Sequence, residues 1–242
     1  MFEKLKFWIK KENQEKHVIV CIHGFGTKRT HEYDNFKIWG EGKYHLYPFD
    51  IYVLESEEDY RPEIWIHRCE SSVEAFLNAG YKVDIIGYSM GGVLASHVAA
   101  KYDINRLFLV SPAFEYLNAG NILSSAKDWI KPKNNNVKNK PSIPIKYTQC
   151  FMEVVRLCKE DISKVKCPVC IVHGDKDEVI SYKSSINAFD KIPHSEKRLF
   201  LIHNGTHHLI NDEQTGNEVY QLFSLFMDGI LLPMKSDISD EI

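Results

Sequence analysis

Short apolar runs, rich in β-branched residues, alternate with longer stretches of helical spacing, and this alternation constrains the fold most strongly. Strands that are apolar throughout must be covered on both faces, which is typical of a parallel sheet between two layers of helices. The pattern therefore predicts a doubly wound α/β fold. We expect strands at 17–22, 49–54, 82–87, 106–110, 169–173 and 198–203, an edge strand at 4–10, and helices at 64–78, 91–101, 147–162 and 218–232.

The length of 242 residues suits a single α/β domain, which we expect over residues 1–235. More than fifty residues, including four prolines, separate the strand ending near Val110 from the one starting near Cys167. Because so long a connection usually has a function or a structure of its own, we expect residues of about 113–165 to form a small cap insertion over the carboxyl edge of the sheet. An ordinary packed insertion fits the spacing equally well. The acidic tail 236–242 is expected to fray.

Composition excludes several classes of function. Thirty basic and 33 acidic side chains give a formal net charge of −3, which lacks the basic excess of a nucleic-acid-binding protein. No apolar run approaches the roughly 18–20 residues that cross a bilayer. Residues 1–11 do not resemble a signal peptide, so we expect a soluble, cytoplasmic protein without stable membrane insertion.

The six cysteines show no spacing of a disulfide framework. Cys167 and Cys170 form a C-x-x-C motif, but a metal site of this type requires a second ligand pair, and no other C-x-x-C is present. We therefore expect both thiols to be small apolar side chains in the core.

The most informative motif is Gly87-Tyr88-Ser89-Met90-Gly91, which matches G-x-S-x-G. It follows an apolar strand and precedes an Ala-rich helix, as this motif requires. A sharp turn between strand and helix would expose the Ser89 hydroxyl at the edge of the sheet. The motif predicts that Ser89 is a nucleophile, and that the Met90 amide contributes to an oxyanion hole.

A serine nucleophile needs a base to take its proton and an acid to orient the base. Two later segments that follow strands supply candidates, Gly174–Val179 with Asp175, Asp177 and Glu178, and Asn204–Asp212 with His207 and His208. Their order along the chain, serine then acid then histidine, is the order found in enzymes whose nucleophilic serine lies in a G-x-S-x-G turn between a strand and a helix. A metal site built from His203, His207, His208 and Asp212 is disfavoured because no helical H-x-x-x-H pair is present, and no glycine-rich nucleotide motif follows a strand.

With these motifs, nearly the whole chain resembles the α/β-hydrolase superfamily, and within it small bacterial carboxylesterases and monoacylglycerol lipases. The resemblance implies that the acid of a G-x-x-D pattern is Asp177, and that the histidine preceding an apolar pair and a carboxylate is His207 rather than His208. It also implies that the loop His23-Gly24-Phe25-Gly26 donates the Phe25 amide to the oxyanion. His203 is expected to be structural.

The chain departs from that family after the strand expected at 49–54, where relatives usually carry a D-x-x-G-x-G loop. Here the sequence is Glu55-Ser56-Glu57-Glu58-Asp59-Tyr60-Arg61-Pro62, an acidic run that we expect to be a solvated loop. Residues 27–47 are also unlike the common pattern.

These features predict a cofactor-free, metal-free serine hydrolase for a small-molecule ester of small to medium acyl chain, or a monoglyceride. Thioesterases, amidases and peptidases use the same catalytic groups, and a non-catalytic ligand-binding protein of this fold is a further alternative. Nothing in the sequence indicates the oligomeric state.

Overall fold

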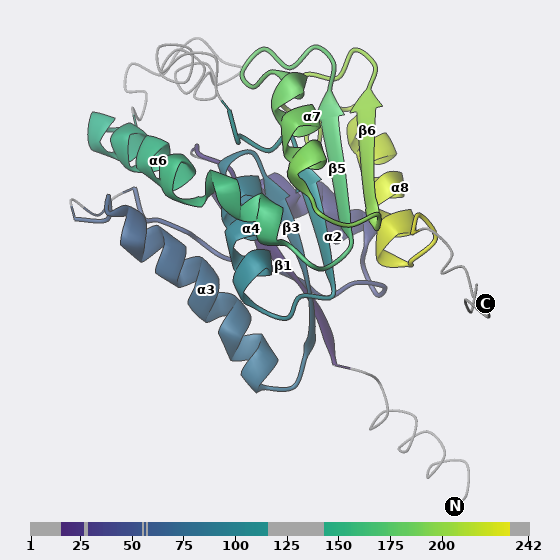
Figure 1. Cartoon of the computed structure of the whole chain (residues 1–242), viewed down its shortest axis with the longest axis horizontal. Helices are drawn as coiled ribbons and strands as arrows, with labels where there is room; N and C mark the ends of the chain where they lie inside the picture. Colours follow the sequence, from purple (N-terminus) through teal and green to yellow (C-terminus); the bar gives the residue numbers. More distant parts are fainter. Residues whose placement is uncertain (1–15, 27–28, 55, 57, 116–142, 233–242) are drawn as a thin grey trace, which may run out of the picture.

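The computed structural model describes residues 16–26, 29–54, 56, 58–115 and 143–232, and within them the chain forms one six-stranded sheet. The strand order is β2-β1-β3-β4-β5-β6, and every neighbouring pair is parallel (Figure 1). The predicted parallel α/β sheet is thus confirmed, while the edge strand expected at 4–10 and the tail 236–242 lie outside the described residues. The strands are β1 (His17–Ile22), β2 (Leu46–Pro48), β3 (Lys82–Tyr88), β4 (Arg106–Val110), β5 (Val169–Gly174) and β6 (Lys197–Ile202).

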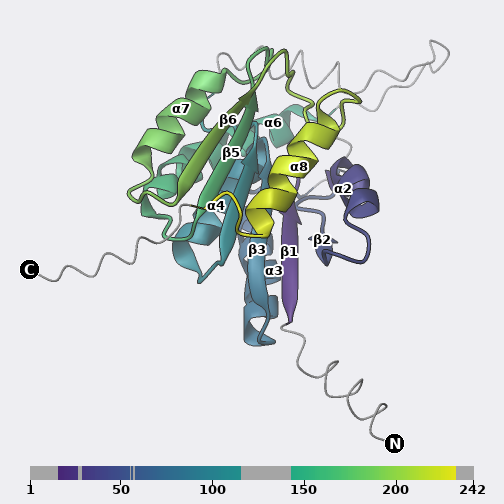
Figure 2. The ribbon, with the colours of Figure 1, turned by 90° about the vertical axis from the view of Figure 1, so that its right-hand side faces the viewer.

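Helices cover both faces of the sheet. Because successive strand residues point to opposite faces, they pack into two separate apolar cores, one under each layer of helices. Figure 2 shows α7 and α8 on opposite sides of the strands. One core contains Ile85 and Trp65, and the other contains Ile86 and Phe223. The first face carries α3 (Pro62–Asn78), α4 (Met90–Lys101), α6 (Ile145–Cys158), the 3-10 helix η2 (Lys159–Lys164) and α7 (Tyr182–Lys191); the second carries η1 (Arg29–Tyr33), α2 (Asp34–Trp39) and α8 (Gly216–Met227).

The strand order reverses between β1 and β3. From β1 the chain crosses to β2 at one edge, and it returns to β3 on the other side of β1. In open α/β sheets, ligands bind outside the carboxyl ends of the strands at such a switch point. The loop after β1 and the turn after β3 therefore lie where a ligand is expected.

The prediction of a strand at 49–54 is wrong. The strand in this region, β2, comprises only Leu46–Pro48 and ends before that range. Side chains, instead of a neighbouring strand, take the backbone amides of the following segment. The Ile51 amide donates to His23 Nε2 (2.9 Å), and the Val53 amide donates to Asp59 Oδ2 (2.7 Å). The segment is irregular chain, in which Ile51 and Tyr52 are buried in the core and Val53 is exposed.

The acidic run that follows is not simply a solvated loop. The Asp59 side chain is only 5% exposed, and its Oδ2 also accepts from Arg68 Nη1 of α3 at 2.6 Å. This ion pair ties the loop to the helix that follows it.

Most predicted helices form, and their ends differ from the expected ones by a few residues. The last one ends at Met227 instead of residue 232, followed by Gly229 at φ 79°, the left-handed conformation that commonly ends helices. No sequence pattern indicated α2 or α7.

The helical face predicted over 147–162 is buried by α6 and η2. Phe151, Val154, Val155, Cys158 and Ile162 are each at most 3% exposed and belong to one core. The proposed cap at 113–165 includes residues 116–142, which lie outside the described part, so its position over the sheet edge stays a prediction.

The C-x-x-C cysteines are buried free thiols, as expected. Burial raises the pKa of the Cys167 thiol to about 12 and that of Cys170 further. Neither thiol is an activated nucleophile.

Candidate active site

Ser89 lies alone between β3, which ends at Tyr88, and α4, which begins at Met90. Its backbone has φ 53° and ψ −118°, a conformation that costs a non-glycine residue of order 1–3 kcal/mol. The Ser89 amide donates to Val110 O of β4 at 2.9 Å, which anchors the turn to the next strand. The fold therefore keeps Ser89 in a strained conformation at the carboxyl end of β3, as the G-x-S-x-G motif predicts.

The glycines of this motif allow α4 to begin directly against β1. A Cβ atom at Gly91 would lie 2.0 Å from the Ile22 carbonyl oxygen, and one at Gly87 would lie 2.5 Å from the Gly91 carbonyl oxygen. In the loop after β1, a Cβ at Gly24 would come within 3.2 Å of Ser89 Cβ. The serine turn and the loop after β1 are therefore in direct contact.

His207 connects Ser89 to Asp177 through two hydrogen bonds. Its Nδ1 lies 2.7 Å from Asp177 Oδ2, and its Nε2 lies 3.1 Å from Ser89 Oγ. Because a carboxylate only accepts, Nδ1 carries the proton and Nε2 accepts from the serine hydroxyl. The imidazole is 1% exposed and the carboxylate is fully buried. The structure thus brings together the three residues that the sequence singled out.

Two glycines bring the acid and the histidine together from different loops. A Cβ atom at Gly174, which ends β5, would lie 2.1 Å from the carbonyl oxygen of Gly205. That same oxygen accepts from the Lys176 amide at 3.0 Å. Only a glycine at 174 lets the two loops approach this closely.

The other two candidate carboxylates, Asp175 and Glu178, bind the loop that carries His207 at groups other than the His207 imidazole. Asp175 accepts from the Asn204 amide at 2.7 Å and from His203 Nδ1 at 3.0 Å, and Glu178 accepts from the His207 amide at 3.2 Å. The geometry therefore favours Asp177 among the three. His203 follows the end of β6 and is largely exposed.

The partly exposed His208 contacts the edge of the His207 ring at a centroid distance of 5.9 Å, and His207 is the one that reaches Ser89. Tyr88, which the sequence did not indicate, supports this arrangement. Its hydroxyl donates to the His207 carbonyl oxygen at 2.9 Å, across the site from β3.

Asp177 is held ionised at neutral pH. Burial alone would raise the pKa of its carboxyl group, but hydrogen bonds from His173 and His207 more than offset that effect and hold the pKa well below its usual range. Oδ1 accepts from the amides of Val179 (2.9 Å) and Ile180 (2.7 Å). The carboxylate can therefore orient His207 and stabilise its protonated form.

The loop after β1 is held by the side chains of Glu32 and Tyr52, which no motif indicated. The Gly24 amide donates to Glu32 Oε2 at 2.8 Å. The Gly26 amide donates to the Tyr52 hydroxyl at 2.7 Å, and that hydroxyl donates back to the Gly26 carbonyl oxygen at 2.8 Å. Within the described residues, no protein acceptor is found for the amide of Phe25, which lies between the two glycines, or of Met90. These are the two amides that the sequence predicts for the oxyanion hole.

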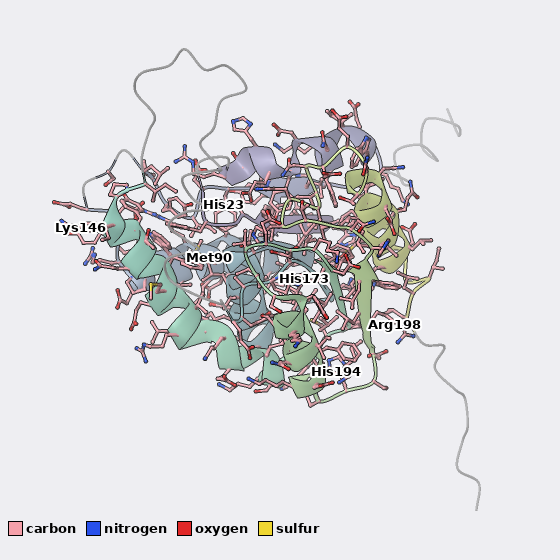
Figure 3. All side chains as sticks on the ribbon, turned by 90° about the horizontal axis from the view of Figure 1, so that it is seen from above. His23, Met90, Lys146, His173, His194 and Arg198 are labelled. Atoms are coloured by element: carbon pink, nitrogen blue, oxygen red, sulfur yellow. The ribbon has the colours of Figure 1, made fainter. Side chains whose placement is uncertain are left out.

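His23 fixes the start of this loop as a neutral imidazole. Its Nε2 accepts from the Ile51 amide, so the proton is on Nδ1, which donates to the Gly24 carbonyl oxygen at 2.7 Å. Complete burial lowers the pKa of His23 to about 4. Figure 3 labels His23 and Met90, which lie on different elements near the centre of the molecule.

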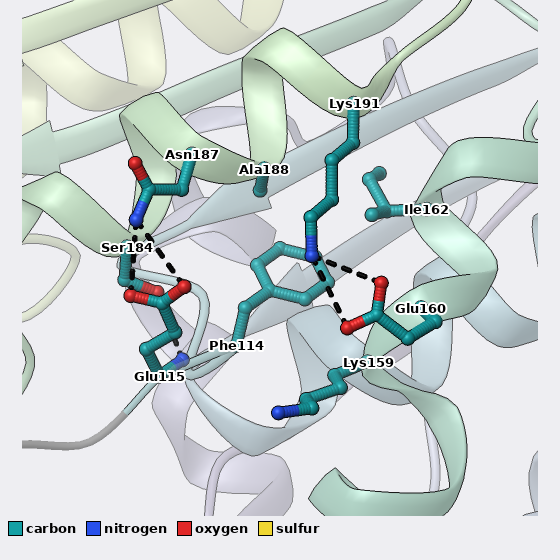
Figure 4. A pocket seen from close by; sticks show the side chains of 9 residues that line it. All are labelled: Phe114, Glu115, Lys159, Glu160, Ile162, Ser184, Asn187, Ala188 and Lys191. Atoms are coloured by element: carbon teal, nitrogen blue, oxygen red, sulfur yellow. Dashed lines mark hydrogen bonds and ion pairs between the residues drawn. The ribbon is translucent and has the colours of Figure 1, made fainter.

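A small pocket elsewhere involves none of these residues. It lies between α7, η2 and the chain after β4, and its volume is about 20 Å³ (Figure 4). Two polar contacts lie across it, an ion pair between Lys191 and Glu160 (2.9 Å) and a hydrogen bond from Asn187 to Glu115. Over the described ranges, no group of three or more His, Cys, Asp or Glu side chains is arranged to hold a metal ion.

Several solved structures with a similar arrangement of strands and helices are described as lipases or hydrolases. A monoacylglycerol lipase from Paleococcus ferrophilus is 17% identical, covers 89% of this chain and 97% of its own, and gives a TM-score of 0.68. A soluble variant of the monoglyceride lipase of Saccharomyces cerevisiae, in complex with a substrate analogue, is also 17% identical, with 90% and 88% covered and a TM-score of 0.67. A meta-cleavage product hydrolase from Pseudomonas fluorescens IP01 is 19% identical, with 89% and 92% covered and a TM-score of 0.67.

The chain has the α/β-hydrolase fold. The model of a family described as serine aminopeptidase, S33, matches residues 117–214 of this α/β-hydrolase-fold chain, a range that contains Asp177 and His207 but not Ser89. No curated protein matches the sequence. These comparisons confirm the predicted resemblance in fold to monoacylglycerol lipases. None of the described helices is both long and apolar enough to span a membrane.

Proposed function

We propose that this protein is a serine hydrolase that cleaves carboxylic esters through Ser89, His207 and Asp177. The observation that carries the proposal is the continuous hydrogen-bond chain from Ser89 Oγ through His207 to Asp177 Oδ2, with distances of 3.1 Å and 2.7 Å. The strained backbone of Ser89 adds support, because α/β hydrolases place their nucleophile in such a turn.

In the first half of the reaction, Ser89 Oγ attacks the acyl carbon while His207 Nε2 takes the hydroxyl proton. The carbonyl oxygen becomes an oxyanion, which accepts hydrogen bonds from the Phe25 and Met90 amides. When the tetrahedral intermediate collapses, the bond to the leaving alcohol breaks, and His207 donates its proton to that oxygen. The product is an ester between the acyl group and Ser89.

Water completes the cycle by the same proton transfers. His207 Nε2 removes a proton from a water molecule that attacks the acyl-enzyme, and then returns it to Ser89 Oγ as the acid leaves. Asp177 keeps the imidazole in one orientation and balances its positive charge in both halves. No metal or cofactor takes part in this scheme.

For the substrate, we propose an ester of small to medium acyl chain or a monoglyceride. The monoacylglycerol and monoglyceride lipases among the structural neighbours support this choice. The rings of Phe151 in α6 and Phe25 stack with centroids 5.1 Å apart, and the Tyr147 hydroxyl donates to Val53 O at 2.8 Å. These contacts place α6 beside the proposed oxyanion loop, in line with a cap at 113–165 within a single domain of 1–235.

Hydrolysis of an ester series tests the proposal. p-Nitrophenyl esters of two to sixteen acyl carbons and monoacylglycerols are offered to the wild type and to Ser89→Ala. We expect a maximum of kcat/KM at short to medium chains, and a loss of about 10⁵- to 10⁶-fold in kcat for Ser89→Ala. Equal rates across the series would contradict the substrate class, and an active Ser89→Ala variant would contradict the mechanism.

A peptidase is the second candidate, because the matching family is described as a serine aminopeptidase. The same acyl-enzyme scheme serves an amide, with an amine as the leaving group. Amino-acid anilides and thioesters, tested beside the esters, separate the three leaving groups.

The six buried free thiols, which lie outside disulfides, support the cytoplasm as the compartment of this reaction.

A further inference from the structure

A second buried histidine contacts the proposed catalytic acid from behind. His173 lies in β5, one residue before its end, and its side chain is 0% exposed. Its Nε2 lies 3.0 Å from Asp177 Oδ2, the same oxygen that accepts from His207, and 3.1 Å from Ile180 O. Its Nδ1 lies 2.6 Å from Ser185 Oγ of α7. Asp177 is therefore placed between two serine–histidine pairs, and Figure 3 labels His173 among the side chains beside α7.

The neighbours of His173 define which of its ring nitrogens is the donor toward Asp177. Nε2 faces a carboxylate and a carbonyl oxygen, which both only accept, so Nε2 carries a proton. Nδ1 faces a hydroxyl, which can donate to it. The Nε2–H group is therefore shared between Asp177 Oδ2 and Ile180 O, and Nδ1 forms a hydrogen bond with the Ser185 hydroxyl.

The pair formed by His173 and Ser185 cannot itself meet a substrate. Ser185 is 0% exposed and lies on the face of the sheet that α7 covers. What this pair can affect is the orientation of Asp177. With Oδ1 bound to two amides and Oδ2 bound to two imidazoles, a rotation of the carboxylate breaks hydrogen bonds on both oxygens.

We infer that His173, oriented by Ser185, is a positioning residue of the hydrolase: it holds the Asp177 carboxylate in the one orientation that directs His207 toward Ser89. This inference rests on the proposed function. It predicts that removing the Nε2–H donor lowers kcat while leaving substrate binding nearly unchanged, because His173 lies behind the acid, away from Ser89.

Two substitutions of His173 test this. His173→Leu removes the donor, and His173→Gln keeps an N–H at nearly the same distance from the backbone. We expect His173→Leu to lower kcat by roughly 10- to 100-fold with KM changed by less than about twofold, and His173→Gln to recover most of the loss. Val172→Ala is the matched control, since it creates a cavity in the same strand on the opposite face, and its kcat should stay near that of the wild type.

Nitrogen-15 spectra of the histidine side chains add a readout that does not depend on turnover. In the wild type we expect the signals of hydrogen-bonded imidazole N–H groups to include those of His207 Nδ1–H and His173 Nε2–H. In folded His173→Leu, the His207 signal should shift. The pKa of the Asp177 carboxyl group should rise, because the contact from His173 that stabilises its charged form is lost.

The outcomes separate the two proposals. An inactive wild type would contradict the proposed function itself. An active wild type with His173→Leu at wild-type kcat, or with a His207 signal that does not move, would overturn the positioning role. Equal losses of kcat in His173→Leu, His173→Gln and Val172→Ala would show a general packing effect and overturn it as well.

Discussion

The two halves of the proposed site are built in different ways. In the acid–histidine half, the contacts come from residues close to the motifs themselves, because Gly174 meets Gly205 and both loops directly follow strands. In the oxyanion half, the loop after β1 is held by Glu32 and Tyr52 and by the bond from Ile51 to His23. The direct contacts of the first half thus come from residues within or next to the motifs, whereas the second half depends on side chains outside any motif.

The comparison teaches where substitutions should act. Changes in the acid–histidine half should affect catalysis with little effect on the rest of the fold. Changes in the oxyanion half should reduce activity and stability together, since its supports also belong to the core.

Among substitutions in the groups that support Ser89, Asp177→Asn should have the largest effect. The amide removes the negative charge and permits the wrong tautomer of His207, so we expect kcat to fall by about 10⁴-fold. Ester hydrolysis measures the fall in kcat, and thermal unfolding measures the expected small change in stability. A variant that keeps more than a tenth of the wild-type kcat would show that another carboxylate takes the role.

Gly174→Ala should separate the acid loop from the histidine loop. The added Cβ would meet the Gly205 carbonyl oxygen at 2.1 Å, and a displacement of the order of 1 Å at the site costs about 100-fold in kcat. Gly216→Ala is the matched control, because its Cβ finds its nearest neighbour at 3.3 Å. Equal activities of the two variants would contradict the account of how the loops converge.

Tyr52→Phe tests the oxyanion half. It removes one hydroxyl and leaves both polar groups of Gly26 without that partner, so we expect a loss of roughly 1–3 kcal/mol in the free energy of unfolding. We also expect kcat to fall by about tenfold, since one oxyanion donor is worth 10²–10³ and the loop is shifted but not removed. Tyr33→Phe, which loses a buried bond to Ile22 O, should lower stability while leaving kcat nearly unchanged. The same kcat in both variants would argue against a specific role of Tyr52.

At neutral pH the smallest effect is expected from His23, which makes stability depend on pH only below its unfolded-state pKa. Its pKa is about 4 in the folded protein and about 6.5 in the unfolded chain, so the unfolded state binds the additional proton between these values. Stability from this group is present above pH 6.5 and is lost as the pH falls toward 4, by at most about 1.4 kcal/mol per pH unit. Chemical denaturation of the wild type and His23→Gln across this range measures it. Parallel curves would contradict the buried neutral imidazole.

The same contrast explains what the sequence could predict. The strands β1, β3, β4, β5 and β6 are apolar runs that pair in order, and the Ser89 turn follows from its glycines, so local pattern was sufficient. The segment 49–54 has the same apolar character, yet side chains of His23 and Asp59 take its amides, and no local pattern indicates such partners.

Helix α7 and His173 were missed for related reasons. The helix is only ten residues long and packs on the sheet with small polar residues such as Ser184 and Ser185, so that few apolar residues mark its buried face. His173 looked like part of an apolar strand, and only the position of Asp177, four residues later, gives its imidazole a partner.

Labelling with a fluorophosphonate probe, followed by mass spectrometry of the modified peptide, tests the central claim most directly. The account predicts that the wild type is labelled at Ser89, that labelling is lost in Ser89→Ala, and that it is much slower in Asp177→Asn. A folded wild-type protein that is not labelled, or that is labelled at a different residue, would contradict the claim that Ser89 is an activated nucleophile.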